Sequence, residues 1–322
     1  MHVVHWGILG TARIAESQFI PAIRDVIDSE ITAVASRDAT RASAFATRNA
    51  IPTAYDNYEA LLADPQIDAV YIPLPNHEHA RFAILAAKYG KHVLCEKPLA
   101  LHAQEVKEMR DAATAQGTLM MEAFMYPFHP QWERVRDIIE KGEIGEVRII
   151  SSSFSFPLNN DQDIRMNRSY GGGALYDVGT YCVHVSRMLM QDEPFQVTAL
   201  AHFDEKHGID LTLSGILHFS GGRQAHFDCS FEAMDRQHVD IIGSLGSIAI
   251  THPFRPDKGK AELIIQTDSH TRVEAVSTIN QYTKELEFFC HCVKTNYVPK
   301  HLMEQSLAHA KVLDILYQTA RI

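Results

Sequence analysis

The sequence predicts an α/β protein with an N-terminal doubly wound parallel sheet and a C-terminal α+β domain that contains a large, mostly antiparallel open sheet. Its 322 residues are long for one compact domain and suit two. Short apolar runs alternate with helical patterns in the first third of the chain, whereas segments of period-two alternation fill most of the remainder. We therefore expect two domains, residues 1–123 and 124–322.

The first domain is expected to alternate strands and helices. Strand patterns occur at 3–9, 31–35, 69–72, 93–95 and 119–123, and helical patterns occur at 11–26, 41–47, 58–62, 80–87 and 103–115. Because the strands are continuously apolar and rich in β-branched residues, they indicate a parallel sheet covered on both faces. Ligands of such sheets bind beyond the carboxyl ends of the strands, where the candidate loops below all lie.

The second domain is expected to contain an antiparallel sheet with helices on one face. Alternating segments occur at 147–156, 196–203, 211–219, 224–231, 239–242, 247–250, 263–267 and 272–276. Helical patterns occur at 131–141, 174–190, 281–295 and 303–319. One face of this sheet is therefore predicted to pack against helices.

Composition excludes several classes of function. The net charge is −10 and no Lys/Arg-rich run occurs, which argues against nucleic acid or an anionic membrane as a partner. No apolar stretch approaches the roughly 20 residues that span a bilayer, and the N-terminus does not resemble a signal peptide. Five cysteines, mostly within apolar runs, indicate reduced thiols and a cytoplasmic location.

The first strand pattern ends in a glycine turn, Gly10 to Ala15, with the sequence GTARIA. A dinucleotide site has G-x-G-x-x-G/A at this point. Ala12 occupies the place of the second glycine, and an ordinary strand-helix turn remains the alternative. Its position at the start of a β/α run favours the turn of a Rossmann fold, with these candidate cofactor contacts: Gly10, Thr11, Ala12, Arg13 and Ile14.

The end of the second strand indicates which cofactor binds. A carboxylate there would bind the adenosine ribose of NAD, but this chain has Ser36 and Arg37, with Arg41 four residues on. A guanidinium and a hydroxyl suit a 2′-phosphate. The sequence therefore favours NADP, with NAD possible, over a solvated loop arginine.

A third loop, from Pro73 to Ala80, is expected to be extended by its two prolines. Its candidate cofactor contacts are Pro73, Leu74, Pro75, Asn76 and His79. His77 and His79 flank Glu78, but adjacent loop residues lack the helical spacing of H-E-x-x-H and a third ligand is not evident. We expect no metal.

The fourth strand ends in Glu96, Lys97 and Pro98. Reduction of a carbonyl needs a proton delivered to its oxygen as hydride arrives at its carbon. Lys97 could orient that oxygen or lower the pKa of a nearby phenol, and Glu96 is expected to hold the ammonium or the ribose. A surface ion pair is the alternative.

The candidate phenol lies in GGGALYDVGTYCVH, residues 171 to 184. Asp177 and Tyr181 are four residues apart and would share one face of a helix, with His184 near that face. The three glycines would let the backbone turn tightly and approach a ligand, or form a flexible turn. On spacing alone, Tyr181 fits a buried core residue as well as a catalytic one.

Three motifs in this order, GTARIA, CEKPLA and GGGALYDVGTYCVH, resemble the Gfo/Idh/MocA family of nicotinamide-dependent sugar and polyol oxidoreductases. Many members have a catalytic histidine where this chain has Tyr181. The tyrosine is similar to the branch that contains dimeric dihydrodiol dehydrogenase, NADP-dependent D-xylose dehydrogenase and sugar 3-ketoreductases. EAFMYPFHPQ (122–131), FPLNNDQDIR (156–165) and Ser36-Arg37 also resemble that branch.

The resemblance implies an NADP(H)-dependent oxidoreductase that interconverts a secondary alcohol and a ketone or lactone on a sugar, sugar derivative or cyclic diol. It implies a catalytic Lys97 and an acid/base Tyr181, to which we add Asp177 as the orienting group. It also implies a homodimer or homotetramer formed through the C-terminal sheet. We expect these substrate contacts: Met125, Tyr126, Arg165, Tyr181 and His184. The alternative is a non-catalytic NADP-binding sensor or scaffold of the same fold.

Overall fold

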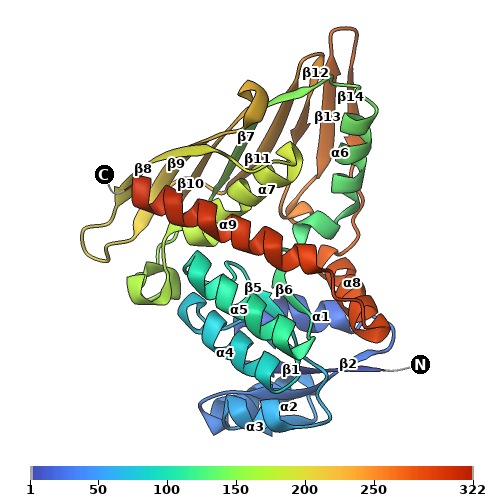
Figure 1. The fold of residues 1–322 in the computed structure, drawn as a ribbon, viewed down its shortest axis with the longest axis vertical. Coiled ribbons are helices and arrows are strands. Elements are labelled where there is room, and N and C mark those ends of the chain that lie inside the picture. Colours follow the sequence, from blue (N-terminus) through green and yellow to red (C-terminus); the bar gives the residue numbers. More distant parts are fainter. Residues whose placement is uncertain (1–2, 321–322) are drawn as a thin grey trace. The chain divides into compact units, whose positions relative to one another are not determined.

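The computed structural model describes residues 3–320, and the contacts divide them into two compact units (Figure 1). The first unit comprises residues 3–125 and 280–310, and the second comprises 126–279 and 311–320. The chain first passes from the first unit to the second between residues 125 and 126, whereas the expected boundary follows residue 123. The sequence does not predict the return of 280–310 to the first unit, because that assignment depends on long-range packing.

The sheet of the first unit has six strands in the order β3-β2-β1-β4-β5-β6, all parallel. The strands are β1 Val4–Leu9, β2 Ser29–Ala35, β3 Thr53–Tyr55, β4 Ala69–Ile72, β5 His92–Glu96 and β6 Met120–Ala123. This is the predicted doubly wound sheet, with β3 added. The sequence misses β3 because three residues are too few for a strand pattern.

Helices cover both faces of this sheet. The helices are α1 Ile20–Ile23, α2 Ala39–Asn49, α3 Tyr58–Ala63, α4 Asn76–Lys88, α5 Ala103–Gln116 and α8 Gln281–Thr295. One core cluster joins the sheet to α3, α4 and α5 and to the part of α9 (Lys300–Thr319) before residue 311. On the other face, Trp6 of β1 contacts Phe289 of α8, with ring centroids 4.9 Å apart.

Two helix starts differ from the predictions. A π-helical turn, Ala15–Phe19, precedes α1, which ends at Ile23 rather than near residue 26. The expected loop over residues 73–80 is wrong from Asn76 onward, because α4 begins there after Pro75. Proline is tolerated at a helix start, where its missing N–H costs nothing.

The sheet of the second unit has eight strands in the order β14-β13-β12-β11-β7-β10-β9-β8 (Figure 1). Every pair is antiparallel except β7 and β10, so the mostly antiparallel prediction is confirmed. The strands are β7 Val147–Ser155, β8 Gln196–Phe203, β9 Asp210–His218, β10 Gln224–Ser230, β11 Arg236–Gly243, β12 Gly246–Ile250, β13 Glu262–Thr267 and β14 Thr271–Ala275.

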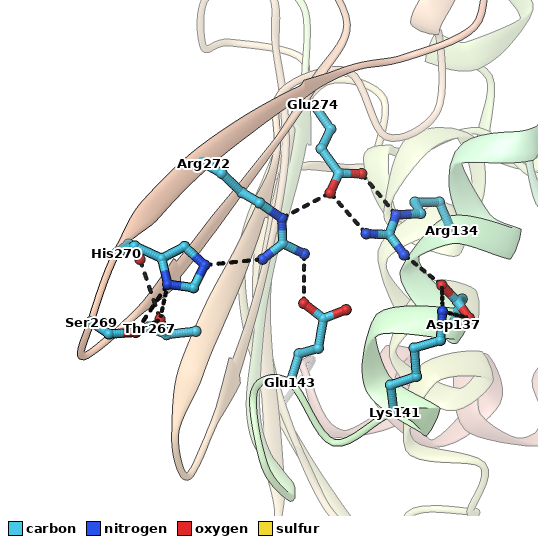
Figure 2. A network of polar contacts seen from close by, with 9 residues as sticks. All are labelled: Arg134, Asp137, Lys141, Glu143, Thr267, Ser269, His270, Arg272 and Glu274. Carbon is cyan, nitrogen blue, oxygen red and sulfur yellow. Dashed lines mark hydrogen bonds and ion pairs between the residues drawn. The ribbon is translucent and has the colours of Figure 1, made fainter.

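Helices α6 (Pro130–Glu140) and α7 (Thr180–Met190) cover one face of this sheet. An ion-pair network fastens α6 to the edge strand β14 (Figure 2). Arg134 donates to both carboxylate oxygens of Glu274 at 2.8 Å, and Arg272 donates to Glu274 at 2.9 Å and to Glu143 at 2.6 Å. The two arginines lower the pKa of Glu274 to about 2.

Candidate active site

Gly10 lies where three strand ends of the first unit meet. Its φ of +109° is a backbone conformation that favours glycine, and a Cβ there would lie 3.0 Å from Cδ2 of Leu74. Its N–H donates to the carbonyl of Ala35 at 2.8 Å. Gly10 is therefore fixed between the loops that follow β2 and β4. Because Gly10 has no side chain, a ligand can approach its backbone closely.

The loop after β2 presents cations and a hydroxyl. Arg41 donates to Oγ1 of Thr11 in the glycine turn at 3.2 Å. The backbone N–H of Asp38 donates to the hydroxyl of Ser36 at 3.2 Å, so the hydroxyl proton of Ser36 can serve another acceptor. Asp38 caps α2 by accepting from the backbone N–H of Arg41 at 3.0 Å. The carboxylate nearest this strand end is thus engaged in a helix cap.

Arg37 is exposed at the end of β2. Burial raises the pKa of the Tyr58 phenol, and the positive charge of Arg37 acts in the opposite direction. Ser36, Arg37 and Arg41 together make this sheet edge suited to a phosphate.

His79 corrects an expectation. Its side chain is completely buried, and its two ring nitrogens lie 2.8 Å from the carbonyl of Leu74 and 2.9 Å from that of Pro98. Burial lowers the pKa of His79 to about 4, so the imidazole is neutral at pH 7. The side chain joins the loops after β4 and β5 and does not reach toward a cofactor. The long-range partner Pro98 is invisible in the local sequence.

Lys97 follows directly on β5, and its side chain is half-buried. Glu96 accepts a hydrogen bond from the phenol of Tyr71 on β4 at 2.6 Å and another from the backbone N–H of Lys97 at 3.3 Å. Glu122 of β6 accepts from the backbone N–H of Leu99 at 3.0 Å. Carboxylates from two neighbouring strands therefore fix the turn that carries Lys97.

In the second unit, the glycine run permits close approaches within the protein. A Cβ at Gly172 would overlap the carbonyl of Arg165, and a Cβ at Gly173 would overlap Oδ1 of Asp210. Asp210, at the start of β9, is completely buried and accepts from the backbone N–H of Leu175 at 2.6 Å. Asp210 thus caps the helical segment that follows. This role of Asp210 is not predicted from the sequence, although a carboxylate at the start of an apolar strand is a signal for it.

The residues after this cap form a π-helical turn, Leu175–Gly179, before α7. Asp177 lies within this turn and Tyr181 beyond it, so the regular helix expected over both is wrong in this detail. Asp177 accepts from Nε of Arg165 at 2.7 Å, and Arg165 also contacts Asp163 at 3.2 Å. Asp177 raises the pKa of Arg165, which keeps the pair ionised. Single π-helical turns within helices are frequent at functional sites.

Tyr181 is 6% exposed and lies in an aromatic cluster. Its ring centroid is 5.2 Å from that of Phe254, 5.5 Å from Phe154 and 5.9 Å from Tyr126. The cluster fixes the ring by packing, which suits either a core tyrosine or an oriented acid/base group.

His184 and Tyr126 form a second polar pair. The hydroxyl of Tyr126 and Nδ1 of His184 share a hydrogen bond of 2.5 Å. Burial, with a smaller contribution from Arg187, lowers the pKa of His184 to about 3, so this imidazole is neutral at pH 7. Tyr126 is 0% and Met125 3% exposed. Both side chains are buried and Tyr126 supports His184, while the contact of Met125 and Tyr126 with the substrate stays a prediction.

An open pocket of about 360 Å³ with a mixed polar and apolar lining lies in the second unit. Asp163 lines it and also bonds to Arg165, which connects the pocket to the Arg165–Asp177 pair. This pocket is not predicted from the sequence, although part of its lining belongs to the motif at residues 156–165. Its polar lining side chains are Asp161, Gln162, Asp163, Asn167, Arg168, Tyr170 and His207.

Within residues 3–320, the structure contains no cluster of histidine, cysteine or carboxylate side chains that could hold a metal ion. Across the same range, no helix is both long and apolar enough to cross a membrane.

Two family models match the chain. Residues 4–124 match an oxidoreductase family with an NAD-binding Rossmann fold, and residues 132–249 match the GFO/IDH/MocA C-terminal domain. The two matches follow the division into units, apart from the segment 280–310.

Similar proteins cover nearly the whole chain. A D-xylose 1-dehydrogenase (NADP⁺) of Haloferax volcanii is 39% identical over 98% of this chain and 97% of its own length. An uncharacterised oxidoreductase of Rhizobium meliloti is 40% identical over 99% and 98%. A 3-ketoreductase from Actinomadura kijaniata, crystallised with NADP and TDP-benzene, superposes with a TM-score of 0.93 at 30% identity, covering 99% of this chain and 98% of its own.

Proposed function

Because the chain belongs to the Gfo/Idh/MocA family of oxidoreductases, we propose that it interconverts a secondary alcohol and a ketone or lactone with NADP(H). The substrate is a sugar, a sugar derivative or a cyclic diol. The observation that carries this proposal is the position of Lys97, which follows β5 at the same sheet edge as the glycine turn after β1 and Ser36 after β2. That edge is where parallel sheets bind dinucleotides.

The residues at this edge fit NADP. Gly10 gives the pyrophosphate close access to the backbone, as do Thr11, Ala12, Arg13 and Ile14 after it. Ser36, Arg37 and Arg41 offer a hydroxyl and two cations to a 2′-phosphate, while Asp38 is engaged as a cap. The remaining proposed contacts are Pro73, Leu74, Pro75, Asn76 and Glu96. When bound, the cofactor supplies or accepts the hydride.

The protein's own groups handle the proton. In reduction, the phenol of Tyr181 donates a proton to the substrate oxygen, and in oxidation it takes one back. The Lys97 ammonium holds that oxygen and lowers the pKa of the phenol. Asp177 keeps Arg165 oriented toward the substrate, and His184 offers a neutral imidazole. This division assigns cofactor binding to residues 1–123 and substrate binding to the segment from 124 onward.

The relatives support the substrate class. One is named a D-xylose 1-dehydrogenase (NADP⁺), and a relative from Actinomadura kijaniata is named a dTDP-3,4-didehydro-2,6-dideoxy-α-D-glucose 3-reductase, so both names refer to carbon–oxygen groups of sugars. The open pocket that Asp163 lines suits a hydroxylated substrate, because its polar lining side chains include carboxylates, amides and a guanidinium. Such groups hydrogen-bond to sugar hydroxyls from both the donor and the acceptor side.

We also propose a cytoplasmic homodimer or homotetramer that pairs through the sheet of the second unit. Leu200 of β8 is 82% exposed, and Ile216 of β9 and Ile149 of β7 are 41% and 38% exposed. A sheet face with exposed apolar side chains is suited to a partner. All five cysteines are free and buried, as expected of a reducing compartment.

The test is a panel of pentoses, hexoses, 3-keto sugars and cyclic diols, each assayed with NADP(H) and NAD(H) through nicotinamide absorbance. Turnover of a sugar or diol with preference for NADP(H) supports the proposal. Tight NADPH binding with no turnover across the panel would instead favour the non-catalytic sensor or scaffold.

A further inference from the structure

Helix α8 carries a carboxyl group into the interior of the first unit. Glu285 is 2% exposed, and its Oε1 has no hydrogen-bond partner among the described residues. The helix is fixed on both sides of this residue, because Thr283 donates to the carbonyl of Ala22 at 3.4 Å and Phe289 packs on Trp6. An ionised carboxylate without partners is costly in such surroundings.

Glu285 belongs to a cluster with Glu96 and Tyr71. Tyr71 is stacked on Phe19, with ring centroids 4.2 Å apart, and its hydroxyl donates to Glu96 at 2.6 Å. Burial, and then the charge of Glu96, raise the pKa of Glu285 well above its usual value. Strands β4 and β5 thus join a phenol and a carboxyl group directly, and the buried carboxyl group of Glu285 on α8 lies within reach of the charge of Glu96.

Two carboxyl groups in a shared buried site do not both ionise near neutral pH. Glu96 accepts hydrogen bonds from Tyr71 and from the backbone N–H of Lys97, both of which stabilise a carboxylate. The unpartnered Oε1 of Glu285 has no such support. The single negative charge therefore resides on Glu96, and the proton resides on Glu285.

Other titratable groups near Glu285 do not change this assignment. Tyr282 on its own helix and Tyr71 on β4 are phenols, and burial with nearby carboxylate charge raises the pKa of Tyr71 well above its usual value. Helix α1, which packs on α8, has the sequence Ile-Pro-Ala-Ile and no titratable side chain. His5 of β1 pairs with Asp68 at 3.2 Å.

We propose that Glu285 is a positioning residue of the active site: by keeping its proton, it leaves Glu96 as the single charge of the cluster and so holds the turn that carries Lys97. The inference rests on the proposed function of Lys97. If Glu285 ionised, its carboxylate would repel that of Glu96. This repulsion would weaken the hydrogen bonds that Glu96 accepts from Tyr71 and from the backbone N–H of Lys97. Activity would then fall at alkaline pH as Glu285 ionises.

The first experiment needs no substrate. Infrared spectra of the protein with ¹³C-labelled glutamate should show, at pH 7, the carbonyl band of a protonated carboxylic acid. The band should vanish in Glu285→Gln and persist in Glu287→Gln, which makes the same change at an exposed position of α8 where the side chain only pairs with Lys284. Absence of the band in the wild type, or its persistence in Glu285→Gln, would overturn the proposal.

The second experiment measures kcat/KM against pH. Glu285→Gln mimics the protonated acid at every pH, so we expect activity within about threefold of wild type at pH 7 and an alkaline limb displaced upward by about one pH unit. Glu287→Gln should follow the wild-type profile. Superimposable profiles for Glu285→Gln and wild type would reject the positioning role. Absence of turnover with every substrate would reject the proposed function, while the infrared band would still decide where the proton resides.

Discussion

Asp210, in the first position of β9, accepts a hydrogen bond of 2.6 Å from the backbone nitrogen of Leu175, at the start of the helical segment that carries Asp177 and Tyr181. One strand of the sheet thus fixes the origin of the helix on which the proposed proton donor lies. The close approach of Gly173 to the same carboxylate shows that nothing larger than glycine fits beside it.

We expect Asp210→Ala to lower the free energy of unfolding by about 1–3 kcal/mol, because a buried N–H loses its acceptor and the helix loses its cap. Urea unfolding followed by circular dichroism measures this. Asp268→Ala, at an exposed loop position, is the control and should change stability by no more than about 0.5 kcal/mol. Equal effects of the two substitutions would contradict a capping role.

If Tyr181 and Lys97 form the acid/base pair, substituting either residue should reduce turnover without weakening the binding of NADPH. Tyr181→Phe and Lys97→Met should each lower kcat by about 10²–10⁴-fold, since each removes a group that acts on the transferred proton. NADPH affinity, measured by fluorescence titration, should survive both. Tyr297→Phe and Lys88→Met are controls at exposed positions and should leave kcat unchanged. Near-normal turnover in either active-site variant would break the mechanism.

Cofactor preference depends on the cations after β2. Arg37→Ala should reduce the ratio of kcat/KM for NADP to that for NAD by about 10–100-fold, because hydrogen bonds to a charged group contribute about 1.5–3 kcal/mol. Arg24→Ala provides the control, since this exposed arginine donates to the carbonyl of Asn49 and not to the glycine turn. An unchanged ratio in Arg37→Ala would show that the phosphate is recognised elsewhere.

The buried side chain of His79 is expected to make the free energy of unfolding depend on pH. Its folded pKa of about 4 lies below the unfolded value of about 6.5. The unfolded chain therefore binds the extra proton between these values, so the contribution of neutral His79 is complete above pH 6.5 and is lost as pH falls toward 4. The free-energy difference between wild type and His79→Gln should shrink across this window. His291→Gln, at an exposed position, should show no such trend.

The fold could be predicted largely from the sequence because each strand of the parallel sheet is a continuous apolar run, and each strand of the second sheet alternates. The misses follow from the same physics. Strand β3 has three residues, too few to show an alternating pattern. The first residues of α4 are polar and resemble a loop, although the preceding Pro75 marks a helix start.

The candidate site shows where local sequence is insufficient. The glycine turn and the loop after β2 could be predicted because their chemistry depends on adjacent residues. The roles of Asp210 and Glu285 could not be predicted, because their partners are distant in the sequence. Asp210 bonds to Leu175, and Glu285 interacts with Glu96. The burial of Tyr126 likewise depends on tertiary packing against α6 and α7, which no local pattern encodes.

The ion-pair network between α6 and β14 gives the last prediction (Figure 2). The arginines hold the pKa of Glu274 at about 2, below its usual value of 4.5. A depressed carboxyl pKa contributes stability above pH 4.5 that is lost as pH falls toward 2. Glu274→Gln should therefore destabilise the protein at pH 7 and converge with wild type in acid.

The magnitude should be modest, about 1 kcal/mol at pH 7, because the Glu274 side chain is 28% exposed and solvent screens the pair. A double-mutant cycle with Arg134→Met isolates the contribution of this ion pair from that of Arg272. Adding 1 M salt should reduce the coupling energy, since screening acts on partly exposed charges. A coupling that is unaffected by salt and by acid would mean that packing of α6, rather than charge, holds the edge strand.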